Sequence, residues 1–150
     1  MTFYHLAEQR HGIIGSVPWH ARKRADIEGF CREHPEWVLV AEEDGQVVGY
    51  ATFSYSEADR AGTVGNNAVH PAFRGRGTGS ALVRAAIEQL TALGARVLQV
   101  VTMEQDAPAR HIYERCGFQE IARSIYYTME SGGAAGVLPA AAPEAQSERR

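Results

Sequence analysis

The chain has 150 residues, of which 45% are hydrophobic and 22% charged, and its formal net charge is −3. These values are typical of one globular domain with a sizeable core, and the negative charge argues against nucleic-acid binding. No apolar run approaches the ~18 residues of a membrane span, and no signal peptide is apparent. We therefore expect a cytoplasmic protein that binds neither membrane nor nucleic acid.

Helix signals dominate the first quarter of the chain. Thr2–Leu6 fits either a short strand or the start of a helix, and Ala7–His11 favours a helix. Pro18 opens a second helical region that continues through His34, with apolar residues at helical spacing on one face.

Three strands are expected next along the chain. Trp37–Ala41 and Val47–Ser54 flank the Asp44-Gly45 pair, which is typical of a hairpin turn. Thr63–Val69 is the third strand. The first two strands are therefore expected to pair antiparallel.

The second half of the chain alternates between helices and strands. Ala81–Leu93 is an amphipathic helix, and Arg96–Met103 reads as a buried parallel strand. Asp106 can cap a further helix, which Gly117 ends. The last two predicted strands are Phe118–Arg123 and Ile125–Met129. The fold class is therefore α/β, with one mixed sheet and helices on both faces.

The composition changes after Ser131, where glycine, alanine and proline dominate. Residues 1–130 are expected to form one domain, and residues 131–150 a disordered tail. The two cysteines, Cys31 and Cys116, have no Cys or His at metal-ligand spacing, so neither a disulfide framework nor a metal site is expected.

A glycine-rich turn is the strongest chemical signal. The chain passes from the third strand through Arg74-Gly75-Arg76-Gly77-Thr78-Gly79-Ser80 into the amphipathic helix. Backbone N–H groups at such a helix N-terminus can hold a phosphate. A P-loop is excluded because no lysine follows the glycines, and Ser80 stands where a dinucleotide fingerprint needs its third glycine.

The pattern Arg74-x-x-Gly77-x-Gly79 after Val69-His70-Pro71 resembles the signature of the GNAT family of acetyl-CoA-dependent N-acetyltransferases. The resemblance extends over Trp37–Met129 and includes the hairpin and the segment Ile112–Phe118. It implies a mixed sheet that splays after the family's fourth strand, and acetyl transfer from acetyl-CoA to a primary amine. The pyrophosphate would lie on the amides of the turn, so its binding residues would be Arg74, Gly75, Arg76, Gly77, Thr78, Gly79 and Ser80.

The resemblance also assigns roles around the thioester. The pantetheine arm would pair with Ala68 and Val69, and the N–H of Val69 would stabilise the oxyanion. Tyr113 matches the family's acid, although a plain core tyrosine would show the same helical spacing. Asp106 stands where the family usually has an asparagine that touches the pantetheine or the sulfur, and it could instead only cap the helix.

The general base is less well defined. Val101 stands where some family members that acetylate protein N-termini have a glutamate, so Glu104 becomes the carboxylate candidate. A water chain could also remove the amine's proton. Further candidates are Asn66 and Asn67 for orienting a water, and Tyr126 and Tyr127 for the acceptor pocket.

The acceptor itself is not identified by these residues, and a small-molecule amine or a peptide would both suit the family. A non-catalytic acyl-CoA-binding or regulatory module of the same fold is the alternative function. A homodimer is common in the family. The family's first strand is either Thr2–Leu6 or missing, which would leave the sheet edge exposed.

Overall fold

The computed structural model describes residues 7–10 and 17–129. Residues 7–10 are helical, as expected for that part of Ala7–His11. Thr2–Leu6, which fits either a short strand or the start of a helix, and the expected tail, residues 131–150, lie outside the described residues. The remaining elements are α2 (Trp19–Glu33), η1 (Pro35–Trp37), β1 (Val38–Glu43), β2 (Gln46–Ser56), β3 (Ala61–Val69), η2 (Pro71–Phe73), α3 (Thr78–Ala92), β4 (Val97–Val100) and α4 (Ala107–Arg115).

The strands form a mixed four-stranded sheet in the order β1-β2-β3-β4. β1 and β3 both pair antiparallel with β2, whereas β3 and β4 run parallel. The predicted hairpin between β1 and β2 is confirmed. Asp44 and Gly45 have φ values of 52° and 75°, and two successive positive values are typical of the tight turns that join antiparallel strands.

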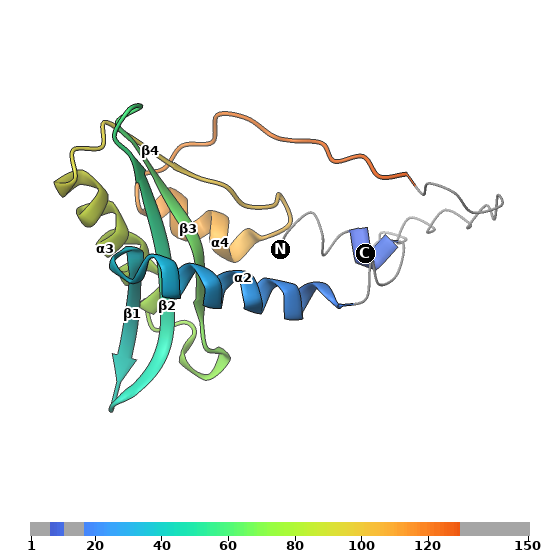
Figure 1. Ribbon diagram of the computed structural model, residues 1–150, viewed down its shortest axis with the longest axis horizontal. Coiled ribbons are helices and arrows are strands. Elements are labelled where there is room, and N and C mark those ends of the chain that lie inside the picture. The colour runs from blue at the N-terminus through green and yellow to red at the C-terminus, as the bar shows by residue number, and fades with distance from the viewer. Residues whose placement is uncertain (1–6, 11–16, 130–150) are drawn as a thin grey trace, which may run out of the picture.

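Helices cover both faces of this sheet, which confirms the predicted fold class. On one face α3 packs against the strands, and a buried cluster joins Phe53 and Val64 to Ala86 and Leu90. α2 crosses the opposite face (Figure 1), where it lies on the same side as Tyr50. The core therefore lies between α3 and the sheet, and the α2 face is left for the site. In the described part of the chain, no helix is long and apolar enough to cross a membrane.

The sheet splays between β3 and β4. The two strands pair only from Ala61 with Val97 to Val64 with Val100, although β3 continues to Val69. At this point Gly65 and Asn66 form a bulge in β3, because the register with β2 shifts there. A Cβ at Gly65 would lie 2.4 Å from Thr52 Oγ1, so only glycine fits the bulge. The divergence that the resemblance implied is therefore present, between β3 and β4.

The two last predicted strands are wrong. Phe118–Arg123 and Ile125–Met129 are extended but have no strand partner among the described residues, and the segment runs away from the sheet (Figure 1). Ile121 is 97% exposed. The alternation of apolar residues in this segment suits a strand, but strand preference is mostly a preference for packing on a sheet surface. The structure provides no such surface here.

Candidate active site

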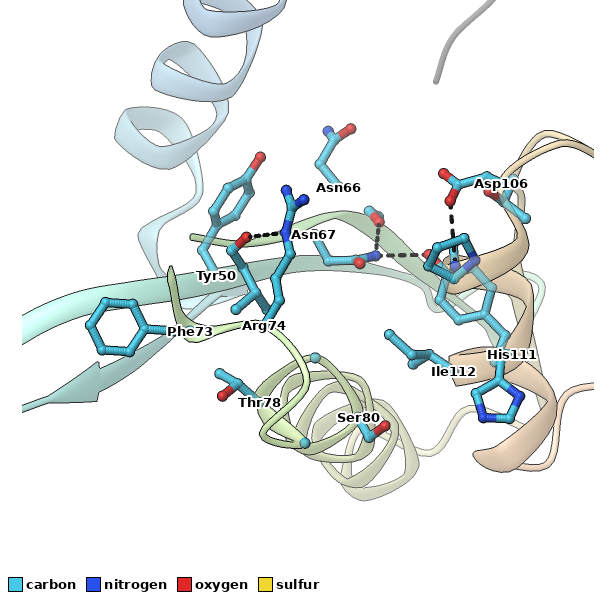
Figure 2. Close-up of a pocket in the computed structure, with 18 of the residues that line it drawn as sticks. Tyr50, Asn66, Asn67, Phe73, Arg74, Thr78, Ser80, Asp106, His111 and Ile112 are labelled. Carbon is cyan, nitrogen blue, oxygen red and sulfur yellow. Dashed lines mark hydrogen bonds between the residues drawn. The ribbon is translucent and has the colours of Figure 1, made fainter. Parts of the chain in front are cut away.

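A cavity of about 870 Å³ opens where β3 leaves β4 (Figure 2). Its walls come from α2, β2, the splayed half of β3, the glycine turn, the segment after β4 and α4. Chain segments that are far apart in the sequence therefore meet at the splay. The lining residues include most of those predicted for the site, namely Val69, Arg74, Gly75, Gly77, Thr78, Gly79, Ser80, Asp106 and Tyr113.

The glycine turn presents backbone amides to this cavity. Gly75 and Gly77 have φ values of 77° and 88°, which favour glycine, and Gly77 is the N-cap of α3. No side chain caps this helix, and Ala81 N donates to Gly77 O at 3.0 Å to close its first turn. The N–H groups before Ala81 therefore point forward from the helix start, as they do in anion-binding turns.

The two arginines of the turn have different positions. Arg74 lines the cavity, and its Nε donates to Val69 O at 3.1 Å. The side chain of Arg76 instead pairs with Glu43 at 2.9 Å, and its guanidinium carbon lies 5.1 Å from the centre of the Phe73 ring. The side chain of Arg76 is therefore directed away from the cavity, toward the carboxylate at the end of β1. Cofactor binding by the backbone amide of Arg76 stays a prediction.

The backbone of β3 also corrects one expectation. His70 N donates to Val48 O at 2.8 Å, so the alternation of an antiparallel ladder turns the backbone groups of Ala68 toward β2. Those of Asn67 and Val69 turn toward the splay. Ala68 is thus wrong as a partner for an added strand, whereas Val69 has the required direction. Asn67 was missed in this backbone role, because the direction of each backbone group of β3 depends on the observed register with β2.

Tyr113 lies on α4 and is only 8% exposed, but it borders the cavity. Its Oη accepts a hydrogen bond from Asn67 Nδ2 at 2.9 Å, and its ring meets the edge of Phe118. Burial raises the pKa of Tyr113, the Asn67 bond lowers it and the charge of Asp106 raises it, with a net rise above 10.0. The phenol is therefore protonated near neutral pH, as an acid must be.

Asp106 is the N-cap of α4, which confirms its predicted capping role. Its carboxylate accepts from Ala109 N at 3.4 Å, and the residue also lines the cavity. Contact between Asp106 and a bound pantetheine or sulfur stays a prediction.

Glu104 does not lie in the cavity, so the prediction of a catalytic base at this position is wrong. β4 ends at Val100, and the turn that follows carries Glu104 to the surface. Its carboxylate, 66% exposed, forms an ion pair with Arg123. The acceptor-side tyrosines also differ from expectation, because Tyr126 and Tyr127 are 47% and 85% exposed in the segment that leaves the sheet.

The sequence reasoning missed the wall that α2 contributes. Trp19, Lys23 and Ile27 line the cavity together with Tyr50 of β2. The three helix residues are spaced four apart, which places them on one face, and this spacing was visible in the sequence. In the described part of the chain, no group of three or more His, Cys, Asp or Glu residues could hold a metal ion.

The comparisons with known proteins agree with this geometry. The sequence model of the acetyltransferase (GNAT) family matches residues 2–118. An uncharacterized N-acetyltransferase of Bacillus subtilis, YhfO, is 29% identical over 72% of this chain and 80% of its own length. The acetyltransferase YE1169 of Yersinia enterocolitica is 32% identical over 68% of this chain and 70% of its own.

A similar fold is found in the solved structure of AAC(6')-Iy in complex with a bisubstrate analogue. It has a TM-score of 0.58 at 21% identity, and the match covers 69% of this chain and 80% of that one. A likeness at this identity shows the fold. Together with the sequence matches, it leads to one assignment: the chain belongs to the acetyltransferase (GNAT) family and is an acetyltransferase of that type.

Proposed function

We propose that this acetyltransferase moves the acetyl group of acetyl-CoA directly to a primary amine, with Tyr113 as the acid. The observation that carries the proposal is a single cavity that connects the amides of the glycine turn with Tyr113. A phosphate site at one end and a protonated phenol at the other match the two ends of a bound thioester cofactor.

Acetyl-CoA would lie along the splay. Its pyrophosphate would accept hydrogen bonds from the amides between Gly75 and Ser80, with the Arg74 guanidinium at the border of the cavity. Its pantetheine arm would add to the open side of β3 at Asn67 and Val69, because those backbone groups point there. The solved neighbour AAC(6')-Iy, which has a similar fold, is in complex with the bisubstrate analogue CoA-S-monomethyl-acetylneamine.

The reaction then needs three events. The nitrogen of a neutral amine attacks the thioester carbon, and the N–H of Val69 stabilises the oxyanion that forms. The C–S bond breaks, and the departing thiolate takes the proton of Tyr113. The former amine loses its extra proton to water in the cavity, and water returns a proton to the tyrosinate, so the products are an amide and a free thiol.

The acceptor would enter beside α2. Trp19, Lys23 and Ile27 form the wall of the cavity there, and Tyr50 of β2 lines the same cavity. The same opening would suit a small-molecule amine or the end of a peptide.

The test is a survey of primary amines with acetyl-CoA, in which thiol release and the N-acetylated product are both measured. We expect the wild-type protein to acetylate at least one class of amine. Tyr113→Phe should lower turnover about 10²-fold, which is the low end of typical acid–base contributions. Its affinity for acetyl-CoA, measured by calorimetry, should be unchanged.

Two results would count against the proposal. Tight binding of acetyl-CoA with no turnover of any amine would indicate a non-catalytic acyl-CoA-binding module. Wild-type turnover in Tyr113→Phe would remove the phenol from the mechanism and leave only the cofactor site.

A further inference from the structure

The side chain of Asn67 connects the bulge of β3 to α4. Its Nδ2 donates to Gly65 O at 3.2 Å and to Tyr113 Oη at 2.9 Å (Figure 2), and the second bond joins residues 46 positions apart in the sequence. A backbone carbonyl can only accept a hydrogen bond, so the nitrogen of the amide must face Gly65. The orientation of the amide is thereby fixed, and its second hydrogen is the one that points at the phenol.

This orientation determines what the phenol can do with its own proton. A tyrosine hydroxyl has one hydrogen to donate and also accepts hydrogen bonds. An amide oxygen facing Tyr113 would take that hydrogen, whereas the amide nitrogen leaves it available. The hydroxyl hydrogen can therefore point into the cavity that Tyr113 borders.

The bulge makes this contact possible. The register between β2 and β3 shifts at Gly65 and Asn66, which brings the Gly65 carbonyl within reach of the Asn67 side chain. Gly65 cannot be replaced without a clash, since its Cβ would lie 2.4 Å from Thr52 Oγ1. Thr52 Oγ1 in turn donates to Asn66 O at 3.3 Å and fixes the other bulge residue.

We propose that Asn67 is a positioning residue that holds the Tyr113 hydroxyl with its proton directed toward the thioester sulfur. The inference rests on the proposed role of Tyr113 as the acid. In the step itself, the C–S bond breaks, the sulfur keeps the electron pair, and the phenol proton moves to it. Asn67 exchanges no proton and stabilises the tyrosinate that remains by its N–H bond.

The first measurement follows the phenol directly and needs no acceptor. Tyrosines are replaced biosynthetically by 3-fluorotyrosine, and the fluorine resonance of position 113, assigned with Tyr113→Phe, is followed against pH. Asn67→Ala should raise the pKa at position 113, because the donated bond favours the ionised phenol. Asp106, whose charge raises the pKa of Tyr113, is unchanged in the variant, so its contribution is constant.

The second measurement is kinetic and uses acetyl-CoA with the amine that the wild type acetylates fastest. Asn67→Ala should lower kcat about fivefold, the equivalent of one neutral hydrogen bond, with little change in KM for acetyl-CoA. In the Tyr113→Phe background the same substitution should have no further effect, because coupled residues are not additive. Asn67→Asp has nearly the same shape without the donor and should lose at least as much.

Gln99→Ala is the matched control. Gln99 Nε2 of β4 donates to Thr63 Oγ1 of β3 at 2.9 Å, in an exposed part of the sheet. This substitution therefore also removes a hydrogen bond between a side-chain amide and a hydroxyl group. It should change neither the fluorine titration nor kcat. Thermal unfolding of each variant shows whether it is folded. If Asn67→Asp does not fold, the conclusion is drawn from Asn67→Ala alone.

An unchanged pKa at position 113 in Asn67→Ala would overturn the inference. So would a kcat loss of equal size with and without the Tyr113 hydroxyl. If Tyr113→Phe itself keeps wild-type turnover, the proposed acid fails, whereas the fluorine titration still reports whether Asn67 binds the phenol.

Discussion

The substitution Gly77→Ala separates the binding role of the glycine turn from its role in folding. Gly77 has φ 88° at the start of α3, and a Cβ there would meet no atom within 4 Å. Gly45 in the β1–β2 hairpin has φ 75° and equally open surroundings, but it lies outside the cavity. Gly45→Ala is therefore a control with similar backbone strain and no expected contact with cofactor.

The two variants should lose similar stability and differ in binding. An alanine in the left-handed region costs about 1–2 kcal/mol, which for a chain of this size lowers Tm by roughly 2–8 °C. At Gly77 the new methyl group would also occupy the space where the phosphate approaches the amides. The loss of one charge-assisted hydrogen bond, about 1.5–3 kcal/mol, raises the Kd for acetyl-CoA at least tenfold.

Calorimetric titration with acetyl-CoA and thermal unfolding without ligand measure the two effects separately. We expect both variants to unfold at lower temperature, and only Gly77→Ala to bind acetyl-CoA weakly. Equal Kd values for Gly77→Ala, Gly45→Ala and the wild type would refute the placement of the pyrophosphate at this turn.

Three further predictions concern the acid, the rejected base and the core. Because the pKa of Tyr113 is raised above 10.0, the loss of kcat due to its ionisation should have its midpoint above pH 10.0 and be absent in Tyr113→Phe; a midpoint below pH 10.0 for a decline that disappears in Tyr113→Phe would contradict this. Glu104→Gln should keep wild-type turnover in the thiol-release assay, because its partner is Arg123 at the surface; a loss near 10²-fold would restore it as the base. Leu90→Ala, at a fully buried position, should lower the free energy of unfolding in urea by about 2–5 kcal/mol, and a loss well below that would show that α3 packs loosely.

Local patterns predicted the elements that are stabilised locally. The Asp44-Gly45 turn and the cap by Asp106 depend on neighbouring residues, and both are confirmed. The glycine turn was also predicted, but α3 begins at Thr78, three residues before the expected Ala81. The helix begins earlier because Gly77 takes the left-handed conformation and serves as the N-cap.

Features that depend on distant contacts could not be predicted. The pairing of Asn67 with Tyr113 spans 46 positions, and the ion pair of Glu104 with Arg123 spans 19. The extended segment after Phe118 has the alternation of a strand, yet its pairing depends on a neighbouring edge that the sequence does not specify. The direction in which the backbone groups of Ala68 point could be determined only from the observed register between β2 and β3.

The central claim is that one cavity holds acetyl-CoA and transfers its acetyl group directly to an amine. The most direct measurement mixes the protein with acetyl-CoA carrying a ¹³C-labelled acetyl group and a panel of primary amines, and follows products and protein by mass spectrometry during a single turnover. We predict that labelled N-acetyl amide and free CoA thiol appear in equal amounts while the mass of the protein stays constant. A labelled acetyl group on the protein before the amide forms, or binding of acetyl-CoA with no amide at all, would contradict direct transfer.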